Sequence, residues 1–185
     1  MYASRAFDRI SVSDYLDGEK DADIRHEYVH GYVYAMAGSS PAHNIIAGNI
    51  ARAFGNALEN RDCVVYTSDM KVRADETVFY YPDVMVVCDN DMTSYFQEKP
   101  CVIVEVMSKS TSRKDLHEKR FVYQTLETLK LYLMVDSQTR QVYGYYRTNQ
   151  GWEERPFETG QGIPVPCVDT ELTHKQIYAK TALAV

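Results

Sequence analysis

Residues 80–107 read YYPDVMVVCDNDMTSYFQEKPCVIVEVM, and the centre of the expected fold lies in this stretch. It contains two apolar runs, Tyr80–Cys88 and Cys101–Met107, of a kind typical of central strands buried on both faces. The polar segment between them predicts a loop. If the two strands pair antiparallel about the centre of that loop, Asp83 and Glu105 lie directly opposite each other and share one face of the sheet.

Two carboxylates inside apolar strands need a common explanation. An ionised carboxylate in a buried strand is costly unless it is paired or bound to a metal. Opposed side chains have Cβ atoms only about 4.5–5.5 Å apart, so two like charges would repel unless a cation lies between them. A hard divalent cation such as Mg²⁺ (or Mn²⁺) commonly takes one or two carboxylate ligands. The alternative for Asp83 and Glu105 is a structural network with Arg or Lys.

The rest of the chain predicts helices among short strands. Apolar residues at helical spacing favour a long helix from about Ala42 to Glu59, begun by Ser-Ser-Pro, and a second helix over Ser112–Thr128. A short helix capped by Ser11 or Ser13 is expected before a hairpin in HEYVHGYVYAMAG. Further strands are expected at Cys63–Tyr66, Met70–Arg73, Leu131–Asp136, Gln141–Thr148 and Trp152–Glu158, with a short helix near His174–Ala179. This order indicates an α/β mixture with a largely antiparallel or mixed sheet.

The length and charge of the chain limit its domain number and its mode of binding to DNA. A chain of 185 residues suits one domain, which we expect to span 1–185. The 26 acidic and 20 basic residues give a net charge of −6, which excludes binding to DNA through an overall positive field but leaves local basic patches open. No apolar stretch approaches about 18 residues, and the amino terminus has no secretory pattern. We therefore expect a soluble, cytoplasmic protein with no membrane contact.

The four cysteines lie far apart in the sequence, at Cys63, Cys88, Cys101 and Cys167. None forms a CxxC pair, and their neighbours are mostly uncharged. The sequence predicts buried, reduced thiols that form neither disulfides nor a zinc site.

The pair Pro82-Asp83, followed by Glu105 at the end of the next strand, resembles the core of the PD-(D/E)xK nucleases. More closely, the chain resembles the Uma-two family, whose members are described as endonucleases. The matching stretches are HEYVHGYVYAMAGSSPAHNIIAGNI, SDMKVR, YYPDVMVVCD, VIVEVMSKSTSRKDLHEKRFVYQTL and YLMVDSQTRQVYGYYR, which follow in family order from about residue 11 to residue 180.

The resemblance implies a restriction-endonuclease-like α+β fold, with a mixed, mostly antiparallel central sheet flanked by helices. It also implies divalent-metal-dependent hydrolysis of phosphodiester bonds, with DNA as the expected substrate. Asp83 and Glu105 would be metal ligands, and the carbonyl of Val106 a third. Such a metal polarises the phosphate and lowers the pKa of a bound water that attacks phosphorus.

The sequence departs from the superfamily pattern at Met107, where a lysine is usual. Lys119, on the expected inner side of the second helix, is the replacement that we favour, since the family carries a lysine there. The alternative is a solvent-exposed pair of Lys119 with Asp115, one helical turn earlier. Lys109 is the second choice. On an extended strand it would point to the same face as Glu105, but it lies about 13 Å further along the chain.

Glu27, His43 and Asp115 are accessory candidates. Glu27 would complete the outer shell of the metal, and the alternative is an exposed hairpin residue. His43, at the start of the long helix, would meet a phosphate beside helix amides, and the alternative is a histidine that caps or packs. Asp69 is expected to order a turn.

The basic residues near the second helix offer a local phosphate-binding surface or a solvated helix face. They are Lys109, Arg113, Lys114, Lys119 and Arg120, with Lys71 and Arg73 from the earlier strands.

Three functions remain open from the sequence. The first is an active endonuclease, and the second is a degenerate nuclease fold that binds nucleic acid or a protein partner without cutting. The third is metal-dependent hydrolysis of another phosphate ester. Both carboxylates favour the enzyme, whereas the negative net charge argues against it. A homodimer is expected, because two symmetric sites would cut both strands of a duplex most easily.

Overall fold

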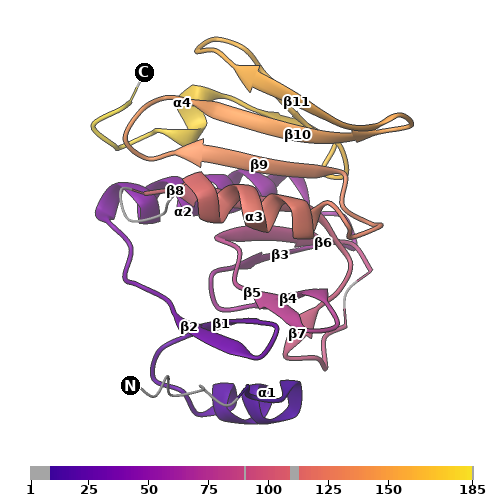
Figure 1. The fold of residues 1–185 in the computed structure, drawn as a ribbon. Helices are drawn as coiled ribbons and strands as arrows, with labels where there is room; N and C mark the ends of the chain where they lie inside the picture. Colours follow the sequence, from indigo (N-terminus) through magenta and orange to yellow (C-terminus); the bar gives the residue numbers. More distant parts are fainter. Residues whose placement is uncertain (1–8, 90, 109–112, 185) are drawn as a thin grey trace.

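A six-stranded sheet forms the centre of the protein (Figure 1). The computed structural model describes residues 9–89, 91–108 and 113–184. The strand order is β11-β10-β9-β8-β6-β3, and its neighbours pair antiparallel except for the parallel pair β8–β9. The strands are β3 (Val64–Thr67), β6 (Val84–Val87), β8 (Pro100–Met107), β9 (Leu131–Asp136), β10 (Val142–Thr148) and β11 (Gly151–Phe157). The mixed, mostly antiparallel sheet predicted from the sequence is confirmed.

A second, five-stranded sheet lies below the first in Figure 1, with the order β2-β1-β5-β4-β7. Its strands are β1 (His26–Val29), β2 (Tyr32–Ala35), β4 (Lys71–Asp75), β5 (Val78–Tyr80) and β7 (Phe96–Gln97). Helix α1 (Val12–Lys20), capped by Ser11, packs on it through the stacked rings of Tyr15 and Tyr28, which also contact Phe79. A small hairpin of β12 (Ile163–Val165) and β13 (Thr170–Leu172) follows near the C-terminus.

Helices α2 (Pro41–Ala57) and α3 (Arg113–Tyr123) cover opposite faces of the central sheet. Side chains alternate along β8, because successive residues of a strand point to opposite faces. Val102, Val104 and Val106 join the cluster around α2, whereas Ile103 and Met107 join the cluster that contains Tyr123 of α3. Helix α4 (His174–Ile177) lies beside α2. Within the described ranges, no helix has the length and apolar character needed to cross a membrane.

The apolar run Tyr80–Cys88 is two strands, not the single strand expected from the sequence. Strand β5 ends at Tyr80 in the five-stranded sheet, and β6 begins at Val84 in the six-stranded sheet. The chain crosses between the sheets at Pro82, which has no N–H to donate to a ladder. The second helix is also shorter than expected, since it ends at Tyr123 and passes into tight turns.

The cysteines are all paired, so the prediction of unpaired thiols is wrong. Disulfides join Cys63 to Cys88 and Cys101 to Cys167. The first pair follows from strand register, because Val64 pairs with Val87 and the two cysteines lie one step beyond. The second joins β8 to the turn between β12 and β13, and no local sequence pattern predicts this contact.

Candidate active site

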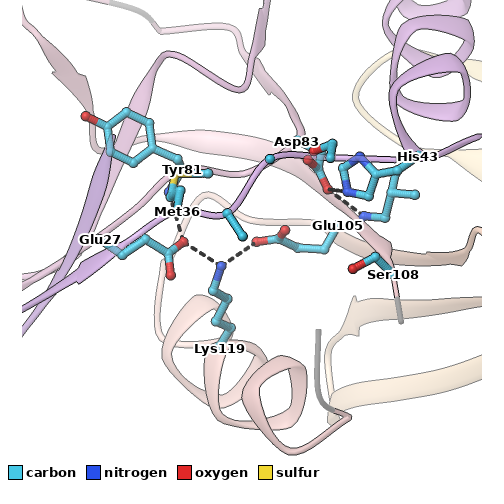
Figure 2. A pocket seen from close by; sticks show the side chains of 12 residues that line it. Glu27, Met36, His43, Tyr81, Asp83, Glu105, Ser108 and Lys119 are labelled. Atoms are coloured by element: carbon cyan, nitrogen blue, oxygen red, sulfur yellow. Dashed lines mark hydrogen bonds and ion pairs between the residues drawn. The ribbon is translucent and has the colours of Figure 1, made fainter. Parts of the chain in front are cut away.

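Asp83 and Glu105 meet where β6 begins and β8 nears its end. Val84 pairs with Val104 and Met85 with Ile103, so the same register sets Asp83, just before β6, opposite Glu105. This agrees with the register expected from the sequence. Both side chains line one cavity of about 210 Å³ (Figure 2). The residues around this cavity are Glu27, Met36, Ala37, Gly38, Ser39, His43, Tyr81, Asp83, Glu105, Val106, Ser108 and Lys119.

The Asp83 carboxylate is held by two donors. Its Oδ2 atom accepts a 2.7 Å hydrogen bond from the backbone N–H of Val106, and His43 Nε2 lies 3.2 Å from the same oxygen. Helix α2 places His43 in its first turn, because Ser40 caps the helix and its Oγ accepts from the N–H of His43. Burial lowers the pKa of His43, but the hydrogen bond and charge of Asp83 raise it more, so the net pKa is raised.

The Glu105 carboxylate is buried, with only 6% of the residue exposed. Its Oε1 atom accepts a 2.9 Å hydrogen bond from Tyr123 Oη, and Lys119 Nζ lies 3.4 Å away. Burial raises the pKa of Glu105 from 4.5 to about 7; the charges of Asp83 and Glu27 also raise it, while Lys119 and Tyr123 lower it. Burial, together with the two neighbouring carboxylates, therefore makes ionisation of Glu105 costly.

The Lys119 ammonium lies between two carboxylates, as Figure 2 shows. Nζ is 2.5 Å from Glu27 Oε1 and 3.4 Å from Glu105 Oε1. Burial lowers the pKa of Lys119, but these two negative charges more than compensate and raise it above its usual value. The same Nζ lies 5.0 Å from the centre of the Tyr80 ring. Lys119 thus carries a fixed positive charge at the wall of the cavity.

Glu27 belongs to the site geometry and is not an exposed hairpin residue. It lies in β1, and its Oε1 accepts from the backbone N–H of Tyr81 at 3.4 Å as well as from Lys119. Glu27 therefore connects the five-stranded sheet to α3 and to the segment between β5 and β6. His43 likewise lies at the cavity, against Asp83.

Other candidates lie elsewhere or outside the described part of the chain. Lys109 falls outside the described residues, and so does the side chain of Asp115. Met107 is buried on the side of the sheet that faces α3, within the apolar cluster of that face. Asp69 is in the turn between β3 and β4, 3.5 Å from Arg25.

The basic residues expected near the second helix do not form one described surface. The side chains of Arg113 and Lys114 are not described. Lys71 is buried and donates to Tyr81 Oη at 3.2 Å, and Arg73 pairs with Glu98 at 3.1 Å. Arg120 lies over the ring of Tyr145, with its guanidinium 4.7 Å from the ring centre.

Sequence reasoning missed Tyr81 and Tyr123 as site residues. Tyr123 was assigned only to the apolar stripe of the second helix, yet its hydroxyl donates to Glu105. The available signal was its spacing, since Tyr123 lies one helical turn after Lys119 and faces the same way. Tyr81 offered no comparable signal, because its role depends on the crossing between the two sheets.

The atoms around the cavity that could bind a metal ion are mostly carboxylate oxygens. Asp83, Glu105 and Glu27 supply them, and the described hydrogen bonds of Asp83 and Glu105 use one oxygen of each. Such a set suits a hard cation such as Mg²⁺ or Mn²⁺ rather than a soft one.

The model of the Uma2 family, described as “Putative restriction endonuclease”, matches residues 12–176. The chain belongs to the Uma2 family. Restriction-endonuclease-like proteins of this kind generally use divalent metals.

Two relatives of this Uma2 protein come from Synechocystis sp. Uncharacterized protein slr1290 is 34% identical over 179 residues, which cover 95% of this chain and 94% of the relative. Uncharacterized protein sll1609 is 29% identical over 143 residues, covering 75% and 81%.

A solved structure shares the fold of the Uma2 chain. It is the crystal structure of “a putative nuclease belonging to DUF820” from Anabaena variabilis. The TM-score is 0.77 with 15% sequence identity, and the match covers 92% of this chain and 98% of the other. The restriction-endonuclease-like fold class predicted from the sequence is confirmed.

Proposed function

We propose that this Uma2 protein is a divalent-metal-dependent endonuclease that hydrolyses phosphodiester bonds in DNA. The observation that carries the proposal is the convergence of Asp83, Glu105 and Lys119 on one cavity at the junction of β6, β8 and α3. Membership in a family described as restriction endonucleases supports the same reaction class.

Asp83 and Glu105 would hold the cation, together with the carbonyl oxygen of Val106. When bound, a Mg²⁺ or Mn²⁺ ion would polarise the phosphate and lower the pKa of a water molecule. The Val106 N–H and His43 hold Asp83 in place, so His43 is a positioning residue in this proposal. The Tyr123 hydroxyl does the same for Glu105.

Lys119 would replace the lysine that the superfamily pattern places at Met107. Its ammonium would stabilise the negative charge that develops on the phosphoryl oxygens as the bond to the leaving oxygen breaks. Glu27 holds this ammonium at 2.5 Å and is therefore the positioning residue for Lys119. Such a charge assists most when it is fixed before the reaction, and burial beside Glu27 and Glu105 fixes it here.

DNA cleavage with and without metal tests the proposal. Purified protein is incubated with plasmid and with single-stranded DNA in the presence of Mg²⁺, Mn²⁺ or a chelator. We expect cleavage with either metal and none with chelator. Metal-independent cleavage would contradict the proposal. Binding of DNA with no cutting under any condition would favour the degenerate module instead.

Matched variants identify the residues. Asp83→Asn and Glu105→Gln remove ligands, and Asp89→Asn and Glu98→Gln remove exposed carboxylates that pair with Lys99 and Arg73. We expect the first two variants to lose metal binding and cleavage together, and the controls to retain both. Equal cleavage by all four variants would reject the site. The homodimer and the cytoplasmic location stay predictions.

A further inference from the structure

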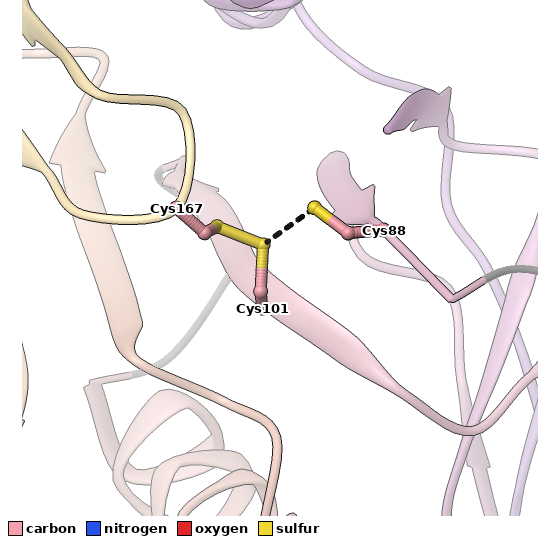
Figure 3. Close-up of side chains that lie close together, drawn as sticks. All are labelled: Cys88, Cys101 and Cys167. Carbon is pink, nitrogen blue, oxygen red and sulfur yellow. Dashed lines mark hydrogen bonds between the residues drawn. A yellow bond between two sulfur atoms is a disulfide. The ribbon is translucent and has the colours of Figure 1, made fainter. Parts of the chain in front are cut away.

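The sulfurs of Cys88, Cys101 and Cys167 gather at one place, away from the carboxylate cavity, and the sulfur of Cys63 is bonded to that of Cys88. They come from four parts of the chain: Cys63 precedes β3, Cys88 follows β6, Cys101 is in β8, and Cys167 is in the turn between β12 and β13. The Sγ atoms of Cys88 and Cys101 lie 3.8 Å apart, although they belong to different disulfides (Figure 3).

The strand register explains this gathering. The pairing of β3 with β6 brings Cys63 opposite Cys88, and the pairing of β6 with β8 brings Cys101 next to the end of β6. The turn that carries Cys167 then reaches the start of β8. The convergence is therefore a product of the fold and not of local sequence, which contains no CxxC pair.

Three of the four sulfurs lie close enough together to share one metal ion. The Sγ atoms of Cys88, Cys101 and Cys167 all lie within 4.8 Å of one another, and the fourth sulfur, of Cys63, is bonded to Cys88. Because Zn–S bonds are about 2.3 Å long, the sulfurs of a tetrahedral zinc site are about 3.8 Å apart. The Cys88–Cys101 separation already has this value. Cys63 lies outside this group of three, so its sulfur has to move toward Cys101 and Cys167 once its bond to Cys88 is broken.

We propose that, in the reduced protein, Cys63, Cys88, Cys101 and Cys167 bind one zinc ion, and that the two disulfides are the oxidised form of the same site. Two equivalents of a dithiol reductant convert the two disulfides into four thiols, and each dithiol leaves as a cyclic disulfide. Binding of Zn²⁺ by the four thiols then releases four protons and gives a tetrathiolate complex of charge −2. Thiol oxidants reverse the first step and release the ion.

The two candidate metal sites differ in chemistry. Thiolates select zinc and similar soft ions, whereas the carboxylates around Asp83 select hard ions. The cysteine site would stabilise the fold, since it connects the edge of the central sheet at β3 to the hairpin of β12 and β13. Cys88 is exposed, so reductants, oxidants and chelators can reach the sulfurs. This proposal does not depend on nuclease activity.

Metal analysis of the full chain tests the proposal. The protein is purified with a dithiol reductant and zinc, and the metal content and cobalt-substituted absorption spectrum are measured. We expect about one zinc per chain and, with Co²⁺, the thiolate charge-transfer and d–d bands of a tetrahedral site. Cys88→Ser and Cys167→Ser should lose these bands. Asp83→Asn should retain them, because it removes a ligand of the other site only.

Alkylation of the unmutated protein covers the case in which a serine variant fails to fold. Bound zinc should protect all four thiols from alkylation, and a strong chelator should expose them. Three results would overturn the proposal: a reduced protein that binds no zinc, disulfides that persist in the dithiol, or a cobalt spectrum that depends on Asp83 but not on Cys88. The last result would assign the ion to the carboxylate cavity.

Discussion

At the scale of single residues, the central contact is Lys119 between Glu27 and Glu105. A buried ammonium is costly alone, and two carboxylates at 2.5 and 3.4 Å compensate for its lost hydration. The same arrangement leaves a positive charge at the wall of a cavity whose other charged groups are acidic or histidine. We infer that this ammonium acts on a bound substrate.

Replacing Lys119 with Met should lower the turnover of DNA cleavage by about 10²–10³-fold, because a fixed charge that stabilises the transition state is lost. Mn²⁺ binding, measured by calorimetry, should change little, since Lys119 is not a ligand. Lys99→Met is the control, because Lys99 lies in an exposed pair with Asp89. Cleavage at the parental rate by Lys119→Met would remove Lys119 from the mechanism.

Glu105 gives a pH dependence that can be measured without substrate. Its pKa rises from 4.5 to about 7 on folding, chiefly through burial, so between these values the folded protein binds more protons than the unfolded chain. The free energy of unfolding of the metal-free protein should therefore fall as pH rises from about 4.5 to 7. Denaturant titrations in chelator should show this fall relative to Glu105→Gln. A constant difference between the two proteins would contradict it.

At the scale of elements, the start of α2 connects helix capping to the site. Ser40 caps the helix and accepts from the N–H of His43, whose ring contacts Asp83. Capping therefore sets the position of a group in the cavity as well as the stability of the helix.

Ser40→Ala should lower the free energy of unfolding by about 0.5–2 kcal/mol and also lower DNA cleavage, because His43 loses its fixed position. Ser11→Ala is a matched control, since Ser11 caps α1 and accepts from the N–H of Asp14 in the same way. Chemical denaturation and cleavage rates are measured on both variants. An equal loss of cleavage in both would show that the effect is one of stability alone.

The sequence allowed some of these elements to be predicted and not others. Antiparallel register depends only on strand and loop positions, so the opposition of Asp83 and Glu105 could be calculated. The break between β5 and β6 at Pro82 could not be predicted, because these strands belong to two sheets that are assembled from distant segments of the chain. The disulfides were not predicted either. The Cys63–Cys88 pair depends on the pairing of β3 with β6, and Cys101 and Cys167 are 66 residues apart in the sequence.

At the scale of the whole molecule, the candidate site needs both sheets and both long helices. Glu27 comes from the five-stranded sheet, Asp83 and Glu105 from the six-stranded sheet, His43 from α2 and Lys119 from α3. We infer that the chain folds as one unit, because a site assembled in this way requires all of these elements to be in place together.

The variant Phe54→Ala tests whether the chain unfolds as one unit. Phe54 of α2 is fully buried against the central sheet, and its truncation should cost about 3–5 kcal/mol of unfolding free energy in a single transition. Phe121→Ala is the control, because Phe121 is 61% exposed and its loss should cost under about 0.5 kcal/mol. Two separate unfolding transitions, with only one shifted by Phe54→Ala, would contradict a single unit.

In the proposed function, Asp83 and Glu105 hold a divalent cation at the cavity. Anomalous diffraction from crystals soaked in Mn²⁺ is the decisive test, because the signal locates the ion without reference to activity. We expect one peak within coordination distance of both carboxylates, and we expect this peak to be lost in crystals of Glu105→Gln. A Mn²⁺ peak elsewhere, or no peak beside Asp83 and Glu105 at saturating Mn²⁺, would contradict it.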